Sequence, residues 1–95
     1  MRNIKTKKIN QEDLKKTGID ITSWSKWDCD PSEFDWSYSD TETAYVFKGD
    51  VDVSYDGKTT KILGGHLVQF PKDMSCNWKV NERIEKVYTF EKVEF

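Results

Sequence analysis

The chain has 95 residues, which is enough for one hydrophobic core and therefore for a single domain. Charged residues make up 34% of it and aromatic residues 14%, with a formal net charge of −2, a composition that indicates a soluble protein and argues against disorder. Hydropathy excludes a transmembrane helix, because no window approaches the roughly 18 consecutive apolar residues that one needs. The basic N-terminus lacks a following apolar segment, so we expect no signal peptide, no membrane partner and a cytoplasmic location.

The first predicted elements are an arm and a short helix. Residues 1–9 contain isoleucines spaced among lysines and are expected to form either an edge strand or a mobile arm. A helix is predicted over residues 10–17, since Asn10 can cap it, acidic residues favour its first turn, and Gly18 ends it. Because two turns are not stable alone, Leu14 and Ile19 are expected to attach the helix to the rest of the domain.

From residue 19 onward the sequence alternates with the period of β-strands. The predicted strands, separated by turns at intervals of about ten residues, cover residues 19–21, 23–29, 33–38, 41–48, 51–55, 58–63, 66–70, 75–80 and 84–95. Gly49 and Asp50 are expected to end one of them. The strongest turn signal is Asp56-Gly57, because a type I′ hairpin needs positive φ at both central residues. Eight or nine short strands predict an all-β sandwich or barrel over residues 19–95, within one small domain spanning residues 1–95.

Charge is distributed unevenly along the chain. Residues 1–16 carry six basic and two acidic side chains, whereas residues 27–56 carry one basic and nine acidic side chains. The basic start is too small an electrostatic patch for nucleic-acid binding, and no RNA-binding aromatic motif accompanies it, so no nucleic-acid partner is expected. The two cysteines, Cys29 and Cys76, form no CxxC pair, which favours free thiols over a disulfide or a zinc site.

Two spaced motifs carry a family resemblance. The first contains Trp36-Ser37-Tyr38, Glu42 and Gly49, and the second contains Gly65, Pro71, Asp73 and Cys76. This skeleton resembles the two signature motifs of the cupin superfamily, whose small β-barrels often hold a catalytic metal. Residues 31–38, 41–43 and 76–80 more narrowly resemble small single-domain cupins of the (S)-ureidoglycine aminohydrolase cupin-domain family, within the RmlC-like cupin superfamily. The resemblance spans about residues 10–90 and implies a double-stranded β-helix, or cupin jelly roll, with one short N-terminal helix.

The resemblance also implies where a metal would bind. Metal-dependent cupins use three histidines and one glutamate, and the matching positions here are Trp36, Tyr38, Cys76 and the retained Glu42. Trp36 offers only an N–H donor, and the Tyr38 phenol has an ordinary pKa of about 10, so neither replaces an imidazole. The single histidine, His66, is not expected to be a ligand. No cofactor is therefore predicted, although Glu42 and Cys76 leave weak binding of a divalent metal open.

The positions that replace the histidines are expected to line a pocket inside the barrel. The expected lining is Trp36, Tyr38, Glu42, Cys76, Trp78 and Tyr88, with Phe90 also available on the last strand. Aromatic walls around one carboxylate suit a small organic ligand with a flat or apolar body and a donor group or positive charge facing Glu42. The leading hypothesis is a small-molecule-binding cupin module without the three-histidine metal site.

Two alternatives stay open. An enzyme acting on a small nitrogenous or sugar-like metabolite would use Glu42 as acid or base, with Cys76 as a weaker candidate nucleophile, and the resemblance then implies an aminohydrolase-like or isomerase-like cupin. A structural or assembly domain would instead have its barrel plugged by aromatic side chains, with Glu42 hydrogen-bonded to Tyr38 or Trp36. A homodimer formed through exposed sheet edges or faces, covering aromatic residues such as Trp27 or Phe95, is a further expectation.

Overall fold

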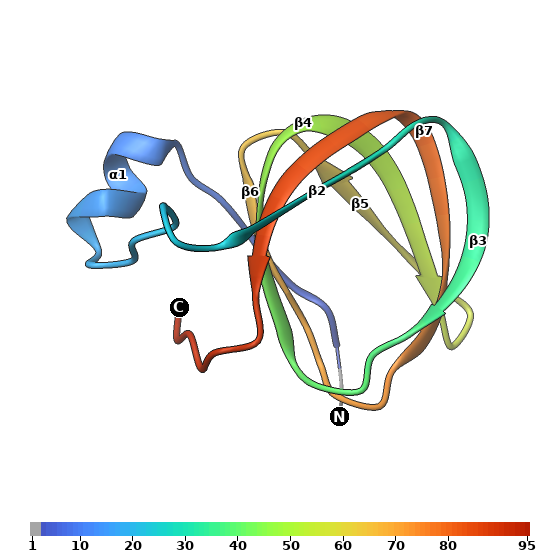
Figure 1. Ribbon diagram of the computed structural model, residues 1–95. Coiled ribbons are helices and arrows are strands. Elements are labelled where there is room, and N and C mark those ends of the chain that lie inside the picture. The colour runs from blue at the N-terminus through green and yellow to red at the C-terminus, as the bar shows by residue number, and fades with distance from the viewer. Residues whose placement is uncertain (1–2) are drawn as a thin grey trace.

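The structure is a computed structural model that describes residues 3–95, and within that range the chain forms one helix and seven strands (Figure 1). The elements are β1 (Lys5–Lys8), α1 (Gln11–Lys16), β2 (Ser25–Cys29), β3 (Ser32–Ser37), β4 (Glu42–Tyr55), β5 (Lys58–Leu63), β6 (His66–Phe70) and β7 (Ser75–Thr89). The predicted all-β fold is confirmed. No helix in the described range is long and apolar enough to cross a membrane.

The two long strands β4 and β7 form the framework of the barrel. They pair with each other, and the sheet order is β1-β6-β4-β7-β2, with every pair antiparallel. The first part of β4 pairs with β6 and its last part with β5, while β7 pairs first with β3 and then with β2. Because each long strand changes its outer partner along its length, the sheet curls around an interior in the manner of a jelly roll (Figure 1).

The prediction that Gly49 and Asp50 end a strand is wrong. β4 continues through both residues, and the register between β4 and β7 shifts here, which indicates β-bulges. Gly49 has φ of +138°, and a Cβ at this position would lie 2.8 Å from the Cα of Ile84 on β7. Glycine therefore lets the strand bend against its neighbour instead of breaking it.

Two other predicted boundaries are also wrong. The strands expected over residues 75–80 and 84–95 are one strand, β7, which ends at Thr89. Residues 19–21 form no strand, because the Asp20 carboxylate accepts hydrogen bonds from the backbone N–H and the hydroxyl of Thr22, at 2.9 and 2.7 Å. This local side-chain turn competes with pairing in a sheet.

The predicted helix cap and hairpin turn are confirmed. Asn10 precedes α1, and its side chain accepts a hydrogen bond from the backbone N–H of Asp13 at 2.7 Å. Asp56 and Gly57 have φ of 48° and 73°, and their neighbours Tyr55 and Lys58 are paired in the sheet. Positive φ at both central positions is the type I′ geometry that the dipeptide predicted.

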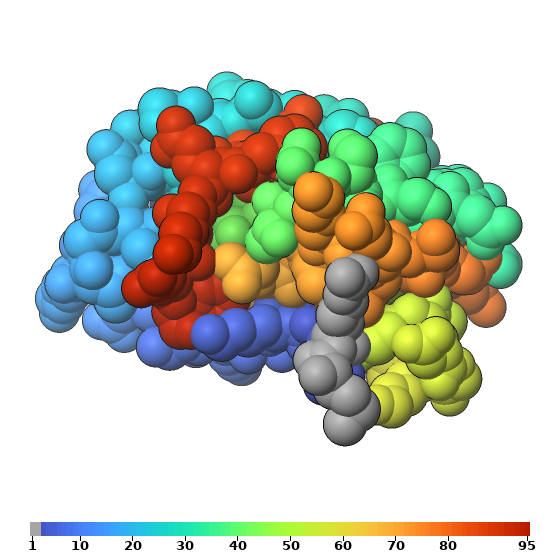
Figure 2. Space-filling view, turned by 90° about the horizontal axis from the view of Figure 1, so that it is seen from below, coloured from blue at the N-terminus to red at the C-terminus, as the bar shows by residue number. Residues whose placement is uncertain are grey.

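The buried side chains form two clusters. One fills the barrel, and the other lies outside it, between α1 and the outer face of the sheet. In the outer cluster Leu14 is 1% exposed, and Ile19 packs beside it, so both residues attach α1 as expected. The C-terminal segment lies beside β1 (Figure 2). Gln69 Nε2 donates a hydrogen bond to the carbonyl oxygen of Val93 at 2.8 Å, and Phe95 packs against the outer cluster.

Candidate binding cavity

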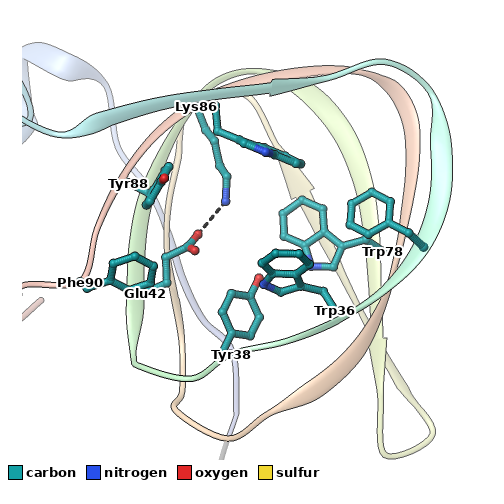
Figure 3. A pocket seen from close by; sticks show the side chains of 9 residues that line it. Trp36, Tyr38, Glu42, Trp78, Lys86, Tyr88 and Phe90 are labelled. Atoms are coloured by element: carbon teal, nitrogen blue, oxygen red, sulfur yellow. Dashed lines mark hydrogen bonds and ion pairs between the residues drawn. The ribbon is translucent and has the colours of Figure 1, made fainter.

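A cavity of about 190 Å³ opens into the barrel (Figure 3). Its lining comes from β2, β3, β4 and β7 and from the residues next to these strands: Trp27, Phe34, Trp36, Tyr38, Glu42, Trp78, Lys86, Tyr88 and Phe90. Trp36 and Phe90 are 52% and 56% exposed, whereas Trp78 is only 2% exposed. The first two therefore lie at the mouth of the cavity and Trp78 lies at its inner wall.

Strand alternation places these side chains on the inner face. On β7 the positions of Lys86 and Tyr88 are two residues apart, so both side chains point to the same side of the sheet. Ala44 on β4 lies opposite Tyr88 in the register, and Glu42, two residues earlier, is on the same face of β4 as Ala44. The cavity is thus produced by the normal two-residue period of the strands.

An ion pair crosses the cavity. Lys86 Nζ, from β7, lies 2.6 Å from Glu42 Oε2, from β4, and Figure 3 shows the two side chains pointing toward each other. Lys86 is 7% exposed and Glu42 is 6% exposed. Each charge needs the other, because an isolated charge at this depth would lose its hydration without compensation.

Aromatic rings surround the ammonium group of Lys86. Its Nζ lies 5.0 Å from the ring centroids of both Trp27 and Trp78, 5.6 Å from that of Tyr88 and 5.7 Å from that of Phe70. These distances are typical of cation–π interactions. Burial lowers the pKa of Lys86, while the negative charge of Glu42 and its hydrogen bond oppose that shift.

The indole N–H of Trp78 lies behind the cavity surface, near the Tyr38 hydroxyl and the Cys76 thiol. Trp78 Nε1 is buried without a hydrogen-bond partner, which is uncommon for an indole N–H. Burial raises the pKa of the nearby Tyr38 hydroxyl, and the negative charge of Glu42 raises it further. The interaction of the hydroxyl with the indole N–H of Trp78 opposes this increase, and the same N–H opposes the rise in the pKa of the Cys76 thiol. Tyr38 thus stays a neutral hydroxyl, stacked on Phe70 with 4.8 Å between ring centroids.

The structure places most of the expected lining residues together. Trp36, Tyr38, Glu42, Trp78, Tyr88 and Phe90 all line the cavity. Glu42 pairs with Lys86, and not with Tyr38 or Trp36 as the plugged-barrel alternative expected.

Cys76 was expected in the lining and is not among the residues that form it. Its side chain packs in the barrel core, where Sγ donates to the carbonyl oxygen of Trp36 at 3.6 Å. Burial raises the pKa of this thiol, which disfavours the thiolate that a nucleophile or metal ligand needs.

Sequence reasoning missed Lys86, Trp27 and Phe34 as cavity residues. The sequence does contain evidence for Lys86. Lys86, Tyr88 and Phe90 are spaced two residues apart in the predicted last strand, so their side chains are expected on the same face of the sheet. A lysine at an inward position of a barrel strand is unusual enough to require a partner. Trp27 was expected on a dimer surface, but it packs edge-on against Trp78 with 5.8 Å between centroids.

The remaining motif residues have structural roles. His66 Nδ1 accepts a hydrogen bond from the backbone N–H of Leu63 at 3.2 Å, across the Gly64-Gly65 turn. Asp73, in the second motif, has φ of 68°, in the left-handed region that glycine favours. Its backbone N–H donates to the carbonyl oxygen of Tyr38 at 2.7 Å, which holds the end of β3 against this turn.

The side chains at the former ligand positions do not suit a divalent metal. Trp36 has no free lone pair, Tyr38 and Cys76 are both held in their protonated forms by burial, and Glu42 is engaged by Lys86. Within residues 3–95 there is no group of three or more histidine, cysteine, aspartate or glutamate side chains that could hold a metal ion.

Comparisons with known proteins agree with this architecture. A model of the EutQ-like cupin domain matches residues 18–88. The crystal structure of a DUF861 family protein from Thermotoga maritima is 39% identical to the chain, has a TM-score of 0.84, and covers 94% of this chain and 100% of that chain. No curated protein matches.

Two EutQ structures are similar at the level of the fold. The EutQ protein of Clostridium difficile is 22% identical with a TM-score of 0.63, covering 90% of this chain and 64% of that chain. A putative ethanolamine utilization protein Q from Salmonella typhimurium is 22% identical with a TM-score of 0.61, covering 66% of this chain and 51% of that chain. This chain thus spans less than two thirds of either EutQ chain.

Proposed function

We propose that this chain, which belongs to the EutQ-like cupin domain family, binds a small planar organic molecule in the barrel cavity. The observation that carries the proposal is a cavity with aromatic walls that also contains a buried ion pair. Aromatic walls favour a flat molecule, and the few polar groups that face the cavity determine its orientation.

The size of the cavity limits the ligand to about one ring. An apolar cavity of about 150 Å³ accommodates a benzene molecule. The 190 Å³ here is therefore suited to a single aromatic or heteroaromatic ring with one or two small substituents. The rings of Trp78 and Tyr88 offer flat surfaces for such a molecule.

The polar groups favour a ligand that carries an oxygen acceptor. The ammonium of Lys86 already neutralises the carboxylate of Glu42, so a cationic ligand would find no unpaired carboxylate in the cavity. We therefore propose a ligand with an oxygen acceptor, in place of the positively charged ligand that the sequence suggested. The donors available at the cavity are the Tyr38 hydroxyl and the ammonium of Lys86. A carbonyl or carboxylate group fits this set of donors.

Thermal unfolding with matched single-ring compounds tests the proposal. Benzoate and benzamide, which carry acceptors, are expected to raise the Tm at millimolar concentration, whereas benzylamine is not. Tyr38→Phe keeps the ring but removes the hydroxyl donor, and it should weaken the effect of benzoate. If no compound changes the Tm, the barrel is a plugged structural domain and the proposal fails.

A second candidate is an enzyme that acts on a small nitrogenous metabolite, as the resemblance to the ureidoglycine aminohydrolase cupin-domain family implies. It is supported by the 2.6 Å contact between Glu42 and Lys86, which is short enough for proton transfer within the cavity. Ammonia release from ureidoglycine, measured with and without added Mn²⁺, tests it. Elemental analysis of the purified protein shows whether a transition metal is bound, and stoichiometric metal would contradict our interpretation of the donor set.

A further inference from the structure

We propose that the Lys86 amine forms an imine with a small aldehyde or ketone that enters the cavity, and that Glu42 carries the proton for this reaction. The inference rests on the proposed function to the extent that the carbonyl compound occupies the same cavity. It adds a covalent step and a substrate class, since a carbonyl group is the electrophile that a neutral lysine amine attacks.

The position of Lys86 separates it from the other lysines of the chain. It is the only buried lysine within residues 3–95, and its Nζ lies at a cavity wall rather than in solvent. Among the described residues its hydrogen-bond partner is Glu42. The nitrogen therefore makes one hydrogen bond, and its other N–H groups are directed toward the cavity (Figure 3). The lowered pKa that burial causes favours the neutral amine further.

Glu42 completes the proton balance. Transfer of a proton from the Lys86 ammonium to the Glu42 carboxylate, across 2.6 Å, leaves a neutral amine beside a carboxylic acid. The amine nitrogen attacks the carbonyl carbon, and the electron pair of the C=O bond moves to oxygen. One proton then passes from nitrogen to that oxygen, giving a neutral carbinolamine. Glu42 then protonates the departing oxygen, which leaves as water, and the protonated imine remains. One ammonium and one carbonyl are consumed, and one iminium and one water are formed, so atoms and charge balance.

The aromatic surroundings suit the product as well as the reactant. The iminium nitrogen keeps the positive charge and stays near the faces of Trp27 and Trp78, whose centroids are 5.0 Å from Nζ. Cation–π attraction therefore stabilises the charge before and after the reaction. The Glu42 carboxylate, regenerated when water leaves, again provides the counter-ion.

Reductive trapping with benzaldehyde tests the inference on the wild-type protein. The protein is incubated with benzaldehyde and sodium cyanoborohydride near neutral pH, and peptide mass mapping over time gives the rate of benzylation at each lysine. Lys86 is expected to be modified at least about tenfold faster than exposed lysines such as Lys15 or Lys79, because Lys86 has the carboxyl group of Glu42 at 2.6 Å inside a cavity that binds the aldehyde. Modification of Lys86 at the rate of exposed lysines or slower would overturn the inference.

Variants and a bulky probe provide the matched controls. Glu42→Gln keeps the amine but removes the proton carrier, and it should slow modification of Lys86 by about a hundredfold. Lys79→Met, an exposed position on the same strand, should leave the rate at Lys86 unchanged. Pyrenecarboxaldehyde is too large for a cavity of 190 Å³ and should modify exposed lysines but not Lys86. Because the wild-type map needs no variant, a variant that fails to fold does not remove the test.

The outcomes separate this inference from the proposed function. Stabilisation by benzoate without preferential modification of Lys86 overturns the imine and leaves the binding site in place. Preferential modification of Lys86 without stabilisation by any acceptor ligand supports the covalent step and overturns the proposed mode of non-covalent binding. Failure of both experiments overturns both proposals.

Discussion

The barrel interior has two parts that are packed differently. Val51, Val53, Ile62 and Val80 form an aliphatic layer in which every residue is at most 3% exposed. They lie on neighbouring strands, with Val51 opposite both Ile62 and Val80 in the register. The aromatic part, around Trp27, Trp78 and Tyr88, instead encloses the cavity. Branched aliphatic chains fill the space between strands, whereas flat rings held at steep angles leave space between them.

The ion pair between Glu42 and Lys86 also distinguishes the aromatic part from the aliphatic layer. A buried pair of opposite charges is a weak contribution to stability, and hydrophobic residues of similar volume often replace it without loss. The pair between Glu42 and Lys86 therefore has a better explanation in function than in stability. The aliphatic layer stabilises the barrel. The aromatic part can therefore contain a buried ion pair, although the pair itself adds little to the free energy of unfolding.

The largest expected effect comes from breaking the ion pair. Lys86→Met leaves the Glu42 carboxylate buried without a counter-ion and should lower the free energy of unfolding by about 3–5 kcal/mol. The double variant Glu42→Leu/Lys86→Met removes both charges and should return to within about 1 kcal/mol of the wild type. Urea denaturation followed by tryptophan fluorescence measures both.

The matched control for this prediction is Lys79→Met, on the exposed face of the same strand. It should change the free energy of unfolding by no more than about 0.5 kcal/mol. A double variant as unstable as Lys86→Met would show that the pair stabilises the fold, contrary to our distinction between the two parts.

The next effect compares the aliphatic layer with the mouth of the cavity. Ile62→Ala creates a void at a fully buried position and should cost about 2–5 kcal/mol. Trp36→Ala removes a larger side chain that is 52% exposed, and it should cost less than about 1 kcal/mol while weakening any ligand effect on the Tm. Equal losses of stability in urea titrations would contradict the assignment of Trp36 to the mouth.

The smallest effect is a pH dependence at Cys76. Burial raises the pKa of this thiol above its ordinary value of 9.0, so the unfolded chain releases the proton at lower pH than the folded protein does. The contribution of the thiol to stability is present below about pH 9 and is lost as the pH rises through the folded-state pKa.

A variant isolates this contribution from other titrating groups. The free energy of unfolding of the wild type relative to Cys76→Ala should fall between pH 7 and pH 10, as measured by urea denaturation at each pH. The comparison is needed because Tyr38, whose pKa is also raised, adds a loss of the same sign, and Lys86, whose pKa is lowered, adds a gain. A constant difference between the two proteins across this range would show that the thiol titrates normally.

Much of the candidate site could be predicted from the sequence. The spacing of Trp36, Tyr38 and Glu42 predicted that their side chains point into the barrel. The alternation of the last strand predicted the same direction for Tyr88, and all four residues line the cavity. Cys76 is the counter-example. It shares the inward face of β7 with Trp78, but its short side chain ends within the packed core instead of reaching the cavity.

The strand boundaries show a similar limit. Local turn chemistry identified the Asp56-Gly57 hairpin because two residues determine that turn without help from the rest of the chain. Gly49-Asp50 has a similar composition, yet the long-range pairing of β4 with β7 carries the strand through it as a bulge.

The sequence by itself determined the alternating strands, the capped helix and the inward aromatic stripe, because each depends on residues close together in the chain. Only the tertiary structure decided that Lys86, on the last strand, meets Glu42, which lies 44 positions earlier at the start of β4. It also decided that the ring of Trp78 is buried with its N–H unpartnered. Both features depend on how strands distant in sequence are paired, and no local pattern specifies the distance between two side chains across a barrel.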